Sequence, residues 1–290
     1  MTFRTVFVIG TGRCGSTVVH EVLARNPDVA FLSNLEDRLG PAHLVSRWNQ
    51  PVHAAFGHRL TRKGRPRFAP SEGYRALARE VSPLLVDPDR DLTAADATPW
   101  LAARTQAFFR RRAERQRRAV VLHKFTGWPR AGYLHAVFPD ARFVHVVRDG
   151  REVAASWLTM PWWQGRRGPA GWGFGPLPDH YAREWEESGR SYVLLAGLAW
   201  KLLMDAYERA RSSVPAAAWM DVRYEDFVRE PAAVVARVCR FAGIRRDRRL
   251  EGSLGAHVAA GPSRVDAVLG AQRPLVERSL RSHLDAWGYE

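Results

Sequence analysis

The segment from Gly10 to Thr17 reads GTGRCGST and combines three glycines with one arginine and three hydroxyl side chains. Its spacing fits the phosphate-binding pattern G-x-x-x-x-G, except that Ser16 stands where that pattern has a lysine. Successive backbone N–H groups in such a turn, at the positive end of a helix, form a concave anion site. Arg13 can replace the charge of the missing lysine with its forked guanidinium. The segment therefore predicts a site for a phosphate or sulfate group, held by Gly12 to Thr17.

Cys14 raises the alternative that the loop carries a catalytic thiol. A thiol at a helix N-terminus can ionise and act as a nucleophile, as in phosphatases with a Cys-x5-Arg motif. That motif needs an arginine six residues after the cysteine, where this sequence has His20. We therefore interpret Cys14 as a small residue in a crowded loop.

The residues around the loop favour a strand before it and a helix after it. The apolar run Thr5 to Ile9 is typical of a strand buried on both faces of a parallel sheet. Ser16 to Arg25 predicts a helix that closes near Pro27, and Asp28 to Leu32 predicts a second strand. Together these segments make a βαβ unit.

Strands and helices continue to alternate along the chain. Further strands are expected at 119–123, 141–147 and 217–222, and further helices at 105–118, 131–138, 151–158, 192–211, 231–242 and 274–287. This alternation predicts an α/β fold with three layers and a mostly parallel central sheet, as one domain over residues 1–290. Residues 38–99 break the pattern with scattered prolines and a basic stretch at Arg59–Arg67, and Trp157–Trp185 reads as a long loop. Such a loop is a candidate lid or binding loop.

The charge of the chain favours a small anionic substrate over a nucleic acid. The net charge is +14, but the positive residues are nearly all arginines that alternate with carboxylates, and no nucleic-acid-binding motif accompanies them. The two cysteines, Cys14 and Cys239, fit neither a disulfide framework nor a zinc spacing, and no apolar run is long enough to span a membrane. These features predict a soluble protein of the cytoplasm, without a membrane span.

A second element combines an arginine and a hydroxyl at the start of a later helix. In the segment RFVHVVRDGREVAASWL, a strand delivers Arg148 at its end and the next helix presents Ser156 eight residues further on. Open α/β sheets bind ligands at the carboxyl ends of their strands, and both side chains can bond one phosphate there.

Taken together, the RCGST loop and this second element resemble the sulfotransferases that use 3'-phosphoadenosine 5'-phosphosulfate (PAPS). The resemblance implies a fold like that of the P-loop nucleoside triphosphate hydrolases. It also implies that Arg148 and Ser156 bind the 3'-phosphate and that Tyr224, in VRYEDFVREP, contacts the donor. Lys124 stands where many members have a lysine near the transferred group. The C-terminal donor loop of the family has no clear match, and Arg264 in GPSR is the nearest basic candidate.

The resemblance implies an in-line transfer of a sulfuryl group to an acceptor hydroxyl, with 3'-phosphoadenosine 5'-phosphate (PAP) as the second product. Arg13, Lys124 and the loop amides would neutralise the developing charge without a metal ion.

A general base must lie within hydrogen-bond reach of the acceptor. Some relatives use a glutamate just after the second strand, which indicates Glu36, with Asp37 as an alternative in register. His123, beside Lys124, is the third candidate, although the histidine of the cytosolic branch follows its lysine by two residues, where Thr126 stands here. All three stay open.

The acceptor side is less defined by sequence. Residues 38–117 and 157–190 are expected to be acceptor-side or lid insertions. Four aromatic residues of the second, Trp162, Trp163, Trp172 and Phe174, would either cover an aromatic or apolar acceptor or pack the loop onto the body. A phenol, a sugar or lipid hydroxyl, or a natural-product intermediate would each satisfy the sequence, and an oligomer is compatible with it.

Other functions also agree with parts of the sequence. A P-loop kinase or another nucleotide-binding protein would use the same loop, and a nucleic-acid-binding protein would use the charge. Ser16 in the lysine position, and the lack of a convincing magnesium-binding Asp after an apolar strand, argue against the kinase.

Overall fold

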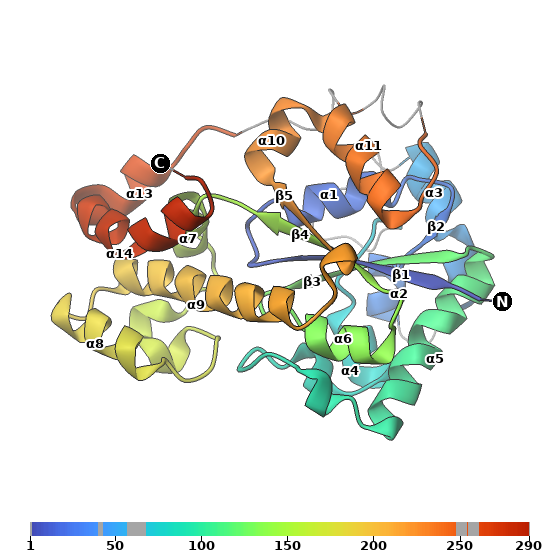
Figure 1. Ribbon diagram of the computed structural model, residues 1–290, viewed down its shortest axis with the longest axis horizontal. Helices are drawn as coiled ribbons and strands as arrows, with labels where there is room; N and C mark the ends of the chain where they lie inside the picture. The colour runs from blue at the N-terminus through green and yellow to red at the C-terminus, as the bar shows by residue number, and fades with distance from the viewer. Residues whose placement is uncertain (1, 40–42, 57–67, 248–253, 255–260, 290) are drawn as a thin grey trace.

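The structure is a computed structural model of the 290-residue chain (Figure 1). It describes all residues except 1, 40–42, 57–67, 248–253, 255–260 and 290. The basic stretch Arg59–Arg67 therefore lies outside the described residues.

Five parallel strands form the central sheet, in the order β2-β3-β1-β4-β5. The strands are β1 (Arg4–Gly10), β2 (Val29–Ala30), β3 (Val120–Thr126), β4 (Arg142–Val147) and β5 (Trp219–Arg223). Gly10 pairs with Thr126, so β1 and β3 end at the same level. Because all the strands are parallel, their carboxyl ends meet at one edge of the sheet, and this edge positions the site.

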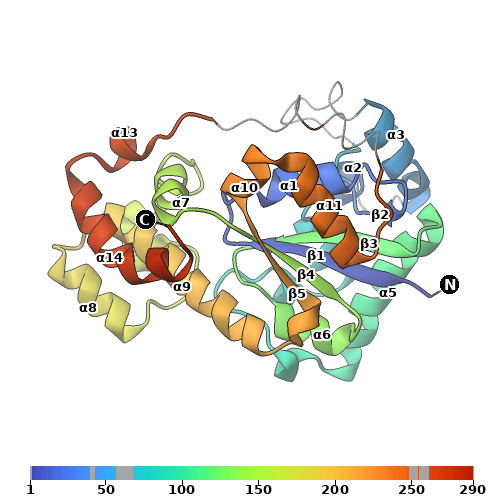
Figure 2. The same cartoon turned by 45° about the horizontal axis from the view of Figure 1, so that its top comes forward.

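Helices cover both faces of the sheet, which confirms the three-layer α/β prediction (Figures 1 and 2). One face carries α1 (Ser16–Leu23), α10 (Tyr224–Arg229) and α11 (Pro231–Ala242), and the other carries α4 (Tyr74–Glu80), α5 (Pro99–Gln116) and α6 (Ala131–Val137). The alternation of side chains along β1 divides the core in two. Val6 and Val8 face the first group of helices, whereas Phe7 and Ile9 face the second.

A further group of helices packs together beyond the end of β4, on the left of Figure 1. It comprises α7 (Gly150–Leu158), α8 (Asp179–Glu187), α9 (Tyr192–Ser212), α13 (Val265–Leu269) and α14 (Arg273–Ala286). Small residues allow the close contacts between them. Gly150 lies directly against the ring of buried Trp200, and Gly197 lies against Leu280.

Several boundaries differ from the sequence predictions. The expected loop at 157–185 ends early, because α8 begins after Pro178, where the run of glycines and prolines stops. Helix α5 begins at Pro99, where the Thr98 hydroxyl accepts a bond from the Leu101 N–H. The described residues also form shorter elements: α2 (Asn34–Leu39), α3 (Asn49–Phe56) and the 3-10 turns η1 (His43–Trp48), η2 (Pro83–Val86), η3 (Ala94–Asp96), η4 (Gly165–Arg167), η5 (Pro169–Gly171), η6 (Ala216–Ala218) and η8 (Gly270–Gln272).

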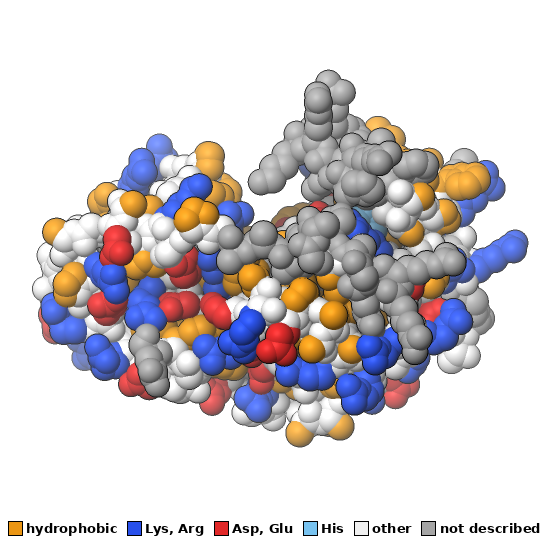
Figure 3. All heavy atoms as spheres, turned by 90° about the horizontal axis from the view of Figure 1, so that it is seen from above, with side chains coloured by type: hydrophobic (Ala, Val, Ile, Leu, Met, Phe, Trp, Pro, Cys, Tyr) orange, Lys and Arg blue, Asp and Glu red, His pale blue; other side chains and the backbone are white. Residues whose placement is uncertain are grey.

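The surface carries charges of both signs. On the face shown in Figure 3, carboxylates are interspersed among the Lys and Arg side chains. Within the described part of the chain, no helix is both long enough and apolar enough to cross a membrane.

We predict that Gly150→Ala destabilises the fold by about 1–3 kcal/mol, because an added Cβ would lie 2.5 Å from the Trp200 ring, which cannot move without repacking the core. Gly261→Ala is the matched control, since its Cβ would meet no atom within 4 Å. Urea unfolding of the two variants measures the difference. Equal free energies of unfolding would contradict the close packing of α7 against α9.

Candidate active site

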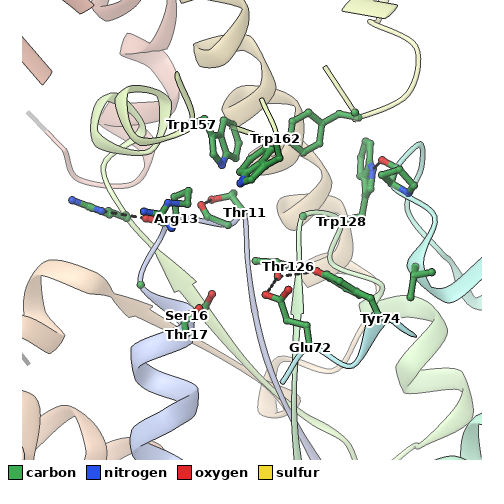
Figure 4. A pocket seen from close by; sticks show the side chains of 18 of the residues that line it. Thr11, Arg13, Ser16, Thr17, Glu72, Tyr74, Thr126, Trp128, Trp157 and Trp162 are labelled. Carbon is green, nitrogen blue, oxygen red and sulfur yellow. Dashed lines mark hydrogen bonds between the residues drawn. The ribbon is translucent and has the colours of Figure 1, made fainter. Parts of the chain in front are cut away.

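A cavity of about 970 Å³ opens at the carboxyl edge of the sheet (Figure 4). The phosphate-type loop forms one side of it, and residues that follow β3 or precede α4 form the other. The residues that line it are Thr11, Gly12, Arg13, Gly15, Ser16, Thr17, Val18, Glu21, Glu72, Tyr74, Val86, Pro88, Thr126, Gly127, Trp128, Arg130, Arg148, Trp157, Trp162, Gly171, Trp172, Gly173, Phe174 and Tyr224.

The loop between β1 and α1 has the backbone of an anion cradle. Gly12, Arg13 and Gly15 all have left-handed φ values, of 86°, 56° and 90°. Left-handed backbone is rare for a residue other than glycine, so Arg13 is held there by its surroundings. Gly15 directly precedes the first turn of α1, whose N–H groups lie at the positive end of the helix.

The ring of Tyr224 packs directly against the loop at Gly15. A Cβ on Gly15 would lie 2.1 Å from Cδ2 of Tyr224, so only glycine fits beneath this ring. The guanidinium of Arg148 lies on the same ring, 4.8 Å from its centroid, in a cation–π contact. Tyr224, for which the resemblance implies a contact with the donor, therefore connects the loop to Arg148.

Arg13, Arg148 and Ser156 come together at one end of the cavity. Nε of Arg13 donates to the Ser156 hydroxyl at 2.8 Å, and Arg148 donates to the Arg13 carbonyl at 3.2 Å. Arg148 also pairs with Glu152 at 3.0 Å. Ser156 itself lies just behind the lining residues, bonded to one of them. Two guanidinium groups thus converge beside a helix start, which is an arrangement suited to a phosphate.

Lys124 contacts residues on two sides of the cavity, Thr17 and Glu72. Its side chain extends from β3 toward α1 and is almost fully buried. Nζ donates to the Thr17 hydroxyl at 2.6 Å and lies 2.7 Å from Oε1 of Glu72. Lys124 therefore places a positive charge between the anion cradle and a carboxylate.

Glu72 is the carboxylate that faces the loop across the cavity, as Figure 4 shows. The Thr126 hydroxyl donates to it, and Tyr74 lies within 3.0 Å of that hydroxyl. Burial alone would raise the pKa of Glu72, but attraction to Lys124 and hydrogen bonds to the carboxylate outweigh burial and lower the pKa. The group is therefore ionised and partly exposed to the cavity.

Sequence reasoning missed Glu72. Its position depends on pairing after β2: the Ser71 N–H donates to the Leu32 carbonyl, and Ser33 forms an antiparallel bridge with Pro70. This pairing brings residue 72 beside the end of β3. One signal was present, because Glu72 is the sole carboxylate between Asp37 and Glu80.

Glu36 and Asp37, two of the expected bases, have other partners. Glu36 is 2% exposed, accepts bonds from the Ser33 N–H and the Asn49 side chain, and lies outside the set of described residues that line the cavity. Asp37 accepts a bond from the Ala76 N–H at 2.9 Å. Helix α2 directs these carboxylates into its own packing rather than into the cavity.

His123 and Arg264 also lie outside the cavity wall. Neighbouring side chains on a strand face opposite ways, so His123 turns away from Lys124 and packs edge-on against Phe109 and Phe125. Burial lowers the pKa of His123 to about 3, which keeps the imidazole neutral. Arg264 is exposed at the start of α13.

The Trp-rich segment contributes to both the core and the cavity. Trp163 is buried and stacks with Trp157, with ring centroids 6.0 Å apart, so it packs the segment onto the body. Trp162, Trp172 and Phe174 line the cavity, opposite Trp128 from the turn after β3. Trp163 therefore packs the segment onto the body, and the covering of an acceptor by the residues that line the cavity stays a prediction.

A family model described as "Sulfotransferase family" matches residues 5–248, which include the loop, Lys124, Glu72, Arg148 and Tyr224. The chain belongs to the sulfotransferase family. This sulfotransferase is thus an enzyme of sulfuryl transfer, as its two sequence elements indicated. A comparison with curated proteins finds no match.

Solved sulfotransferase structures share the fold of this sulfotransferase. STF9 from Mycobacterium avium has a TM-score of 0.59 at 18% identity, over 100% of this chain and 78% of that chain. STF1 from Mycobacterium tuberculosis H37Rv has a TM-score of 0.53 at 17% identity, over 96% and 76%. The sulfotransferase domain from the curacin biosynthetic pathway has a TM-score of 0.51 at 15% identity, over 100% and 99%. These likenesses confirm the predicted sulfotransferase fold.

We predict that Glu72 stabilises the fold in a pH-dependent way. Because its pKa is lower in the folded state than the ordinary value of 4.5, the stabilisation is present above that value and is lost as pH falls through the lowered pKa. Urea unfolding of the wild type and Glu72→Gln between pH 7 and pH 4 measures it. The difference in unfolding free energy should be constant near neutral pH and shrink below about pH 5. A difference that grows toward low pH would contradict the Lys124–Glu72 pair.

Proposed function

We propose that the enzyme takes its sulfuryl group from PAPS and transfers it to an acceptor hydroxyl by in-line displacement. The observation that carries the proposal is the presence of two anion sites in one cavity, the loop amides at α1 and the Arg13–Arg148 cluster. A donor with phosphate groups on both the 3' and the 5' position of its ribose fits such a pair. A nucleotide with a single phosphate chain would leave the second site unmatched.

The first site accepts the 5'-phosphosulfate. The N–H groups of Gly12 to Thr17 supply hydrogen bonds without carrying a formal charge, and the Ser16 and Thr17 hydroxyls add to them. Lys124 already donates to Thr17, so its ammonium lies beside the same end of the donor.

The second site accepts the 3'-phosphate, through Arg148 and the Arg13–Ser156 pair. The contact between Arg13 and Ser156 gives Arg13 this role in addition to the one expected inside the loop. Tyr224 supports both sites, because its ring touches Gly15 and carries the guanidinium of Arg148. Arg264 is exposed and lies outside the cavity wall, so it is not among the proposed donor contacts.

In the transfer step, the acceptor oxygen attacks sulfur as the bond from sulfur to the bridging oxygen breaks. The SO3 group moves to the acceptor, its hydroxyl proton goes to a base, and PAP leaves with the bridging oxygen. Lys124 stabilises the charge that develops on the leaving oxygen. A sulfuryl group carries less negative charge than a terminal phosphate, so we propose that the step proceeds without a metal ion.

We propose Glu72, in place of Glu36, as the base that takes the proton. It is an ionised carboxylate on the cavity wall, and it faces the loop that would hold the donor sulfate. Its pairing with Lys124 and Thr126 fixes its position. Glu36, Asp37 and His123 point into packed regions instead.

We propose that the chain acts as one domain whose two insertions form the acceptor side. Residues 38–117 supply Glu72, Tyr74, Val86 and Pro88 to the cavity, and residues 157–190 supply Trp162 and its aromatic neighbours. The cytoplasmic location stays a prediction.

Calorimetry with PAP, ATP and GTP, with and without magnesium, tests the donor. PAP is expected to bind without magnesium and more tightly than ATP. Arg148→Ala should weaken PAP at least about tenfold, since a hydrogen bond to a charged group contributes roughly 1.5–3 kcal/mol. Arg237→Ala, at an exposed position of α11 outside the cavity lining, is the control and should change nothing. Tighter, magnesium-dependent binding of ATP would favour the kinase instead.

The base is tested by transfer from labelled PAPS to an acceptor found by screening. Glu72→Gln should lower the rate of transfer by about 10²–10⁴-fold with PAP affinity retained, because the amide cannot take the proton. Glu36→Gln and Asp37→Asn serve as controls and should retain transfer in proportion to their folded fraction. Full activity of Glu72→Gln, or selective loss in either control, would assign the base elsewhere.

A further inference from the structure

The acceptor half of the cavity has a distinct chemistry. Beyond Glu72, its wall consists mainly of aromatic and aliphatic side chains from three separate segments: Val86, Pro88, Trp128, Trp162, Trp172 and Phe174. Four of these six residues are aromatic, whereas the donor half is lined mainly by glycines, hydroxyls and arginines, together with Val18, Glu21 and Tyr224. The contrast indicates that the two halves bind different kinds of groups.

Trp162 is the most exposed of the four aromatic side chains in this set. It is 53% exposed at the cavity rim, in contact with the edge of Trp163 behind it, with ring planes at 79°. An indole ring exposed to this extent at the mouth of a cavity marks a surface that a ligand can cover with a gain in free energy.

The polar atoms of two other indoles are already used. Nε1 of Trp128 donates to the Pro88 carbonyl, and Nε1 of Trp172 donates to the Gly175 carbonyl, both at 2.6 Å. These bonds fix the two rings, which are 7% and 3% exposed, and occupy the N–H donors that an acceptor could otherwise use. A sugar, with a hydroxyl on most of its carbons, would find few partners here.

Arg130 lines the same half but cannot serve an acceptor anion. It is 3% exposed, and its guanidinium donates to three backbone carbonyls, those of Leu85 at 2.9 Å, Trp128 at 2.8 Å and Asp87 at 3.0 Å. Its hydrogen bonds hold together the two segments that form this wall, and each nitrogen of its guanidinium already donates to a carbonyl. Of the described residues that line the cavity, the other cations are Arg13 and Arg148, both at the donor end.

We infer that the acceptor is a neutral alcohol or phenol on a planar, apolar skeleton, which binds between Trp162 and Trp128 with its hydroxyl toward Glu72. This inference rests on the proposed function, because it assumes that the donor occupies the loop side. It excludes anionic glycans, since a carboxylate or sulfate on the acceptor would be buried beside aromatic rings with no free cation among the described residues nearby.

The test measures binding of 2-naphthol to the PAP-saturated enzyme at pH 7 by calorimetry. Three comparison probes share its hydroxyl or its size: 6-hydroxy-2-naphthoate, which adds one charge, methyl glucoside, and a sulfated disaccharide. Naphthol is expected to bind at least about tenfold more tightly than each of them. Trp162→Ala should weaken naphthol binding at least about fivefold and leave the Kd of PAP unchanged.

Trp100→Ala is the matched control, because Trp100 is also exposed, at 62%, but lies on α5 outside the cavity. It should change neither ligand. Equal or tighter binding of the naphthoate or the sulfated sugar, no naphthol binding, or equal effects of the two Trp variants would overturn the inference. If the wild type does not bind PAP, the proposed donor is refuted. Titrations of naphthol without PAP, compared between Trp162→Ala and Trp100→Ala, then still decide the acceptor class.

Discussion

Lys124 makes the contacts on which the geometry of the site depends. Its ammonium is 2.6 Å from the Thr17 hydroxyl of α1 and 2.7 Å from the Glu72 carboxylate, although β3, α1 and residue 72 are far apart in sequence. A buried ammonium is costly unless it is paired and hydrogen-bonded, so both partners are held in place. The parallel register pairs Lys124 with Val8, two residues before Gly10, and the lysine side chain reaches α1 from there. Two sides of the cavity, α1 through Thr17 and the segment of Glu72, therefore both contact this ammonium.

The half of the cavity that the loop forms, where we propose that the donor binds, could be predicted because its determinants are local. The loop, the strand before it and the helix after it lie within a single short segment, and glycine spacing specifies their backbone. Arg148 and Ser156 are likewise joined by one strand and one helix. The structure brings both elements together beneath Tyr224, which also follows directly after a strand, β5. Parallel strands place such residues at one edge whatever the connections between them.

The opposite half, where we propose that the acceptor binds, could not be predicted in the same way, because its residues reach the cavity through long-range pairing. Glu72 arrives there by a short antiparallel contact with the residues after β2, which no local pattern encodes. Glu36 looked better placed in sequence, but the six-residue α2 turns it inward to Ser33 and Asn49. Among the tryptophans, composition could not separate Trp163, which packs the core, from its neighbour Trp162, which lines the cavity.

A crystal structure of the enzyme with PAP tests the central claim most directly. The account predicts the 5'-phosphate on the N–H groups after Gly12, the 3'-phosphate within hydrogen-bond distance of Arg148 and of the Arg13–Ser156 pair, and Glu72 facing the free side of the 5'-phosphate. PAP bound in the reverse direction, or outside the loop between β1 and α1, would contradict it.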